Sequence, residues 1–147
     1  MPKIIKDGAV VEDSWRGVLL DLETFNERIA NGDAMTDAGV ILEPDQPPSE
    51  LGGDLSSIPL IAINFPVFTD GRGFSYAREL RQRGYSGEIR AVGAFMRDQL
   101  GYLQRCGFNA FDFDENVNLE AALASLGEFS DRYQADVQER EPLFRRR

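Results

Sequence analysis

The chain has 147 residues and a formal net charge of −9, and 42% of its residues are hydrophobic. This length is typical of a single domain with its own core, so we predict one domain over residues 1–147. An acidic chain repels phosphate backbones, and no apolar run approaches the ~20 residues that cross a bilayer. We therefore expect neither a nucleic acid nor a membrane as a partner.

Cysteine and histidine usage narrows the chemistry further. Cys106 is the single cysteine, so no disulfide can form within the chain. A secretion signal has a charged segment followed by an apolar one, and the N-terminal segment lacks this pattern. We therefore expect a cytoplasmic protein. The absence of histidine excludes Ser-His and Cys-His catalysis and every histidine-based metal site.

The first half of the chain predicts a hairpin followed by strands and one helix. The hairpin lies within residues 1–14, where two β-rich runs flank Asp7-Gly8, a strong two-residue turn signal. The remaining predictions are a strand at 18–20, a helix from Leu22 that stops at Asn31-Gly32, a strand at 39–42 and an irregular loop at 43–53.

The second half alternates strands and helices more regularly. The predicted strands are 60–65, 88–92 and 110–113, and the predicted helices are 75–83, 96–105 and 119–126. Two of these helices end alike, at Arg83-Gly84-Tyr85 and Cys106-Gly107-Phe108, with a glycine suited to the left-handed position after the last turn. One strand-helix unit is therefore repeated. After the last predicted helix, we predict a frayed tail over 136–147.

Alternating strand and helix units predict the α/β class, with a mainly parallel sheet and right-handed crossovers. We expect about five strands in an open, doubly wound sheet, with helices packed on it and the short N-terminal hairpin at its edge. A half-barrel-like (β/α) arrangement is the alternative, because the sequence pattern does not distinguish a curved sheet from a flat one.

Ligands of such sheets bind beyond the carboxyl ends of the strands, where the loop Asp70-Gly71-Arg72-Gly73-Phe74-Ser75 enters a predicted helix. Two glycines allow close backbone approach, the helix N-terminus favours an oxyanion, and Arg72 would clamp it. The alternative is a tight turn in which Asp70 caps local N–H groups and pairs with Arg72, while Ser75 is the helix N-cap.

Three further residues are binding candidates. Asp98 and Gln99 lie in the first turn of the next predicted helix, where the helix dipole by itself also favours Asp98. Arg90 lies inside a predicted central strand, so it must either face a ligand or pair with an acid such as Asp112. The acidic run 112–116 has no recognised metal spacing and fits a solvated helix entry better than a metal site. From Arg72 to Arg105 there are seven arginines against three acidic residues, a cationic stretch in an acidic chain.

The chain resembles a bacterial family of unknown function whose genes are typically found beside that of the sulfite reductase haemoprotein. The residues that carry the resemblance are Phe65-Pro66, Asp70 to Ser75, Leu80-Arg81, Gly84-Tyr85, Gly87-Glu88, Arg90-Ala91, Gly93, Asp98-Gln99, Arg105 and Gly107-Phe108. The resemblance extends over nearly the whole chain, including the region of Trp15. It implies a role in sulfite reduction, described for the family as that of an oxidoreductase, and it implies no catalytic residue.

We therefore expect an accessory protein of sulfite reduction or sulfate assimilation that binds an oxyanion or a partner through the Asp70 to Ser75 loop. The expected partner is sulfite reductase or a small sulfur oxyanion, and a homo-oligomer is an open alternative. An enzyme acting on a sulfur oxyanion or a nucleotide-linked sulfur compound, and a non-catalytic assembly protein, are the alternative functions. No cofactor is assigned, since the chain has neither a Cys-x-x-Cys pair nor a G-x-G-x-x-G motif.

Overall fold

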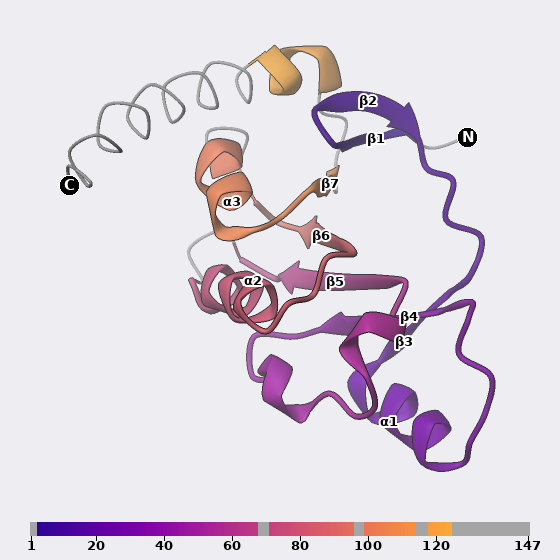
Figure 1. Cartoon of the computed structure of the whole chain (residues 1–147). Helices are drawn as coiled ribbons and strands as arrows, with labels where there is room; N and C mark the ends of the chain where they lie inside the picture. Colours follow the sequence, from indigo (N-terminus) through magenta and orange to yellow (C-terminus); the bar gives the residue numbers. More distant parts are fainter. Residues whose placement is uncertain (1–2, 68–70, 96–98, 114–117, 125–147) are drawn as a thin grey trace.

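The structure is a computed structural model that describes residues 3–67, 71–95, 99–113 and 118–124 (Figure 1). The strands are β1 (Lys3–Lys6), β2 (Ala9–Glu12), β3 (Val18–Asp21), β4 (Ala38–Leu42), β5 (Leu60–Phe65), β6 (Glu88–Gly93) and β7 (Ala110–Phe113). The helices are α1 (Leu22–Ala30), α2 (Arg72–Gln82) and α3 (Leu100–Cys106), with short 3₁₀ turns η1 (Pro48–Glu50) and η2 (Leu55–Ser57). The predicted tail over 136–147 lies outside the described residues, and residues 119–124 of the last predicted helix are helical.

The described strands form one sheet in the order β2-β1-β7-β6-β5-β4-β3. Strands β3 to β7 are parallel neighbours in chain order, and β1 joins β7 as an antiparallel strand. The α/β class and the mainly parallel sheet are confirmed. The sheet has seven strands rather than about five, because the N-terminal hairpin adds two strands to five parallel ones.

The helices pack on one face of this sheet. The strand residues of the main core lie opposite one another in the register, as with Ile61 and Ile89 or Ala91 and Phe111, so they share a face. Buried residues of α1, α2 and α3 belong to the same core, among them Phe25, Leu80 and Leu103. The doubly wound arrangement is therefore wrong, and the strand order agrees with the half-barrel-like alternative. Right-handed crossovers that always step in the same direction along the sheet place every connecting helix on the same side.

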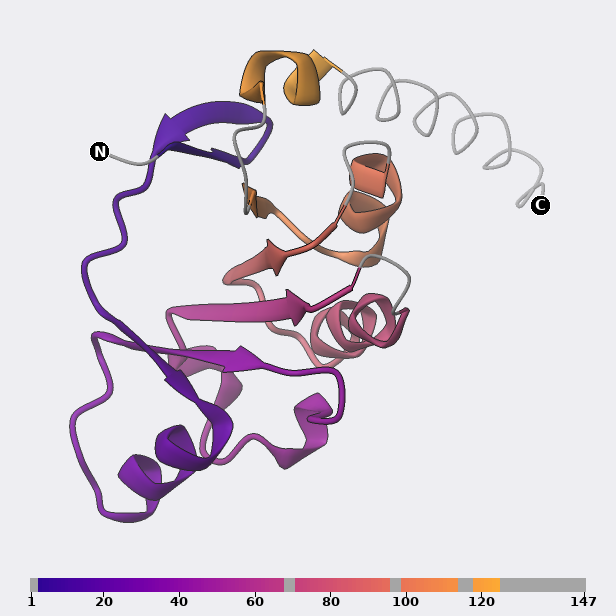
Figure 2. The ribbon, with the colours of Figure 1, turned by 180° about the vertical axis from the view of Figure 1, so that it is seen from behind.

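On the opposite face, one arginine lies between small residues of the neighbouring strands. Ala62, Arg90 and Ala110 are neighbours across β5, β6 and β7, and all three are buried. Residues 13–17, here called the strap, run along the sheet from β2 at one edge to β3 at the other (Figures 1 and 2). The strap brings Asp13 to the side chain of Arg90, so it helps to cover the face that the helices leave open.

Local signals placed the turns and the helix ends correctly. The hairpin turns at Asp7 and Gly8, which both have positive φ angles, as a type I′ turn requires. Gly84 ends α2 with φ +92°, and the N–H of Tyr85 donates to the carbonyl of Leu80. Gly107 ends α3 with φ +124°, and Phe108 donates to Leu103 in the same way. Both predicted glycine caps are confirmed as Schellman motifs. No helix in the described part of the chain is long and apolar enough to cross a membrane.

Candidate functional site

The parallel sheet aligns the carboxyl ends of β5, β6 and β7. Phe65 lies opposite Gly93, and Gly93 lies opposite Phe113, so the segments after these three strands leave the sheet at one edge. This carboxyl edge is where parallel sheets bind ligands. Of the predicted site residues, Gly71, Arg72, Gly73, Ser75 and Gln99 lie in described segments that follow β5 and β6. Asp70 and Asp98 lie outside the described residues.

Helix α2 begins three residues earlier than the sequence indicated. Gly71 is its N-cap residue, and Arg72 is the first helical residue. Ser75 is therefore inside the first turn rather than at the N-cap, and its hydroxyl donates to the carbonyl of Arg72 at 2.9 Å. Gly71, Arg72 and Ser75 are exposed, which leaves the first turn of α2 accessible at the carboxyl edge.

Gly73 has a packing role that the sequence did not reveal. It is buried, and a Cβ atom at this position would lie 2.7 Å from the ring of Phe65 and 2.9 Å from Ile63. Such distances are too short for carbon atoms, so only glycine lets α2 lie this close to β5. Gly73 therefore brings the helix onto the strand, and its backbone faces the core rather than an incoming ligand.

Aromatic rings pack against one another at the carboxyl edge. The ring of Phe65 packs against Phe74 of α2 at 5.5 Å between centroids, and against Phe95 at 6.3 Å. The ring centroid of Phe95 in turn lies 4.8 Å from that of Phe113, the last residue of neighbouring β7. Gln99 is the N-cap residue of α3, partly exposed, and its side chain forms no cap hydrogen bond. The carboxyl edge thus combines packed aromatic rings with the partly exposed polar side chain of Gln99.

Arg78, Tyr102 and Arg105, here called the arginine–tyrosine cluster, lie on the outer side of α2 and α3. The guanidinium carbons of Arg78 and Arg105 lie 5.5 and 5.6 Å from the centroid of the Tyr102 ring, which is cation–π distance. Arg78 also donates to the tyrosine hydroxyl at 3.2 Å, and the ring of Phe74 lies 5.0 Å from that of Tyr102. The cluster is therefore continuous with the loop that enters α2. Sequence reasoning noted the arginines but missed Tyr102; the spacing of Tyr102 and Arg105 on one helix face was the available signal.

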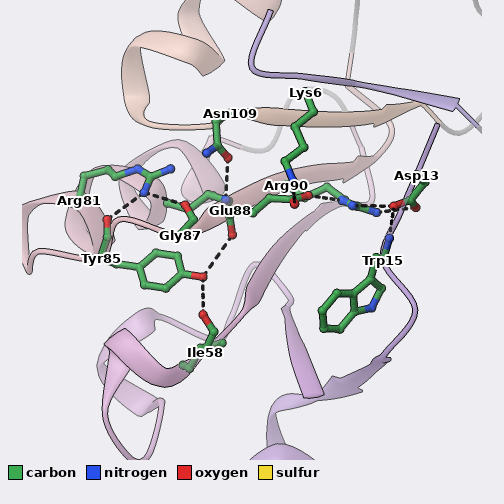
Figure 3. A network of polar contacts seen from close by, with 11 residues as sticks. Lys6, Asp13, Trp15, Ile58, Arg81, Tyr85, Gly87, Glu88, Arg90 and Asn109 are labelled. Atoms are coloured by element: carbon green, nitrogen blue, oxygen red, sulfur yellow. Dashed lines mark hydrogen bonds and ion pairs between the residues drawn. The ribbon is translucent and has the colours of Figure 1, made fainter. Parts of the chain in front are cut away.

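Arg90 lies elsewhere, on the opposite face of the sheet and nearer the amino ends of the strands. Its side chain is 4% exposed. Two guanidinium nitrogens donate to the carboxylate of Asp13 at 2.9 and 3.0 Å, and its Nε donates to Glu88 at 2.8 Å (Figure 3). Lys6 completes the network with an ion pair to Glu88 at 3.0 Å. Arg90 was expected either to face a ligand or to pair with an acid such as Asp112. In the structure it pairs with acids, which are Asp13 and Glu88 instead of Asp112.

The network shifts the pKa values of its members. Burial alone would raise the pKa of Asp13, but hydrogen bonds from Arg90 and the N–H of Trp15 and the charge of Arg90 lower it overall. Burial alone would lower the pKa of Arg90, but its bonds and attraction to Asp13 and Glu88 raise it. Both groups therefore stay ionised. The Nε1 of Trp15 is buried and contacts no acceptor in the described segments, so the hydrogen bonds found there between the strap and β6 come from Asp13.

Other arginines of the cationic stretch have structural partners. Arg81 donates to the carbonyls of Tyr85, Gly87 and Gly107 at 2.8 to 2.9 Å and joins the end of α2 to the turn before β7. Its burial lowers its pKa. Arg83 pairs with Glu79. Arg72, Arg83 and both arginines of the arginine–tyrosine cluster are exposed, and Arg97 lies outside the described residues.

A family model described as a bacterial protein of unknown function, DUF934, matches residues 39–144. The chain belongs to this family. The match includes the carboxyl edge, α2, α3 and Arg90, whereas the hairpin, the strap, β3 and α1 precede it. No curated protein and no solved structure matches the chain. Within the described ranges, no group of three or more acidic or cysteine side chains is placed to hold a metal ion.

Proposed function

We propose that this member of the DUF934 family is an accessory protein of bacterial sulfite reduction, which binds a sulfur oxyanion or a partner through the Asp70 to Ser75 loop. The observation that carries the proposal is the exposure of Arg72 and Ser75 in the first turn of α2, at the carboxyl edge of a parallel sheet. A guanidinium at this place can form two parallel hydrogen bonds to an oxyanion, and the helix dipole adds attraction.

The electrostatics of the chain support an anion at this edge. The protein is acidic overall, yet Arg72 and the arginine–tyrosine cluster place exposed cations on α2 and α3. A local cationic surface on an acidic protein concentrates anions there and leaves the rest of the surface repulsive. The resemblance to proteins encoded beside the sulfite reductase haemoprotein supports sulfite or sulfate as the anion, or the haemoprotein as the partner.

Isothermal titration calorimetry tests the proposal. The full chain is titrated with sulfite, sulfate and adenylylated sulfate, and separately with purified sulfite reductase haemoprotein. Arg72→Ala should abolish the binding heat, whereas Arg83→Ala removes a cation from the other end of α2 and should leave it unchanged. Absence of heat with all four titrants, or equal binding by both variants, would overturn the proposal.

A further inference from the structure

The arginine–tyrosine cluster contributes charge to the proposed anion site, but the proposed function makes no use of its tyrosine ring. Tyr102 is 38% exposed although it is a large aromatic residue, and the two arginines beside it are exposed as well. Among the residues that the structure describes, no carboxylate forms an ion pair with Arg78. Arg78 and Arg105 both lie over one aromatic ring at the surface of an acidic protein.

The packing keeps these side chains in place. Both guanidinium groups stack on the Tyr102 ring, the tyrosine hydroxyl accepts from Arg78, and the ring packs edge-on against Phe74. Side chains that are already ordered lose less conformational entropy when a partner binds. Tyrosine and arginine are also the residue types that most often supply the binding energy of protein interfaces.

The location favours a macromolecule over a small ion. Small ligands bind in concave sites that bury most of their surface, whereas this cluster lies on exposed positions of two helices. Arg78 lies beyond the first turn of α2 and Arg105 in the last turn of α3, so no helix N-terminus assists them. An exposed ion pair of this kind with a free anion gains little because water and salt screen it. A protein segment can instead cover the tyrosine ring with an apolar side chain and pair carboxylates with both arginines at once.

We propose that the arginine–tyrosine cluster is a docking site for an acidic segment of a partner protein, with Tyr102 as the apolar anchor and Arg78 and Arg105 as carboxylate ligands. Charge complementarity argues for this occupant, because cations exposed on an otherwise acidic chain attract an acidic surface. The docking site deepens the proposed function by naming the class of partner. It rests on the proposed function only where the haemoprotein is taken to be that partner.

The test uses the full chain, labelled with ¹⁵N, and a synthetic glutamate-rich peptide with leucines at helical spacing. Binding should shift the amide signals of α2 and α3 around Tyr102. The double variant Arg78→Ala/Arg105→Ala should weaken binding by at least about tenfold. The matched double variant Arg83→Ala/Lys3→Ala removes the same charge from other places and should bind as the wild type does.

Two variants of Tyr102 test the role of its ring. Tyr102→Phe keeps the ring and should retain most of the affinity for the peptide, whereas Tyr102→Ala should lose that affinity.

Three results would overturn the inference: no shift at millimolar peptide, equal binding by the two double variants, or the same shifts with sulfate alone. The last would make the cluster a small-anion site. Calorimetry with the haemoprotein separates the two proposals. If Arg72→Ala removes haemoprotein or oxyanion binding while the peptide does not bind, the proposed function stands and the docking site fails. If the peptide binds and no sulfur ligand or haemoprotein does, the docking site stands and the proposed function fails.

Discussion

Replacing Arg90 by methionine should destabilise the fold, because it removes the centre of the network that joins the strap to the sheet. The substitution keeps an unbranched side chain of similar length and removes the guanidinium. Three hydrogen bonds to Asp13 and Glu88 are lost. Glu88 keeps its ion pair with Lys6, so Asp13 is the charge left without its partner.

The expected size follows from the burial of the pair. Removing one member of a buried ion pair costs about 3–5 kcal/mol. The side chain of Asp13 is 17% exposed and can regain some water, so we expect the lower end, about 3 kcal/mol. For a chain of this size that corresponds to a fall in Tm of roughly 6–12 °C. Adding Asp13→Asn to the variant removes the stranded charge and should restore about 1–2 kcal/mol.

Urea unfolding at neutral pH measures these changes. Trp15 is the single tryptophan and lies in the strap, so its fluorescence reports the strap, while circular dichroism reports the whole fold. In Arg90→Met we expect the fluorescence transition to move to lower urea than the dichroism transition. Arg83→Met is the control, since its surface pair with Glu79 should contribute less than about 1 kcal/mol. A loss below about 1 kcal/mol in Arg90→Met would refute the structural role of Arg90.

Three further predictions concern pH and the helix ends. The lowered pKa of Asp13 stabilises the fold above about pH 4, the pKa of an unfolded aspartate, and this stabilisation is lost as the pH falls further. Asp13→Asn should therefore flatten the decline of stability below about pH 4 in acid titrations followed by dichroism, and an unchanged slope would contradict this. Burial raises the pKa of Tyr85 to about 12, so stability should fall as the pH rises from about 10 through that value, and Tyr85→Phe should remove this alkaline loss in denaturant unfolding; a persisting loss would count against it. Gly107→Ala should lower Tm more than Gly84→Ala, because both have positive φ but only the Cβ at Gly107 would meet Arg81, at 2.7 Å; equal losses in calorimetry would disprove the contact.

The site was only partly predictable from the sequence. The loop that enters α2 and the carboxyl edge followed from chain order, because the ends of parallel strands always meet at one edge. The exposure of Arg72 and Ser75 and the burial of Gly73 depend on where α2 begins and how closely it lies on β5. The partner of Arg90 was beyond sequence reasoning, since Asp13 lies 77 residues away in the chain.

The sequence by itself determined the local features, which depend on only a few neighbouring residues. Asp7-Gly8 set the hairpin turn through its positive φ angles, and Gly84 and Gly107 set the ends of α2 and α3 for the same steric reason. The alternation of apolar runs set five parallel strands and the α/β class. The tertiary structure alone decided that α1, α2 and α3 lie on one face, because that depends on the order in which distant strands pair. It also decided that the strap, through Asp13, meets the arginine on the other face, a contact that exists only once the sheet has formed.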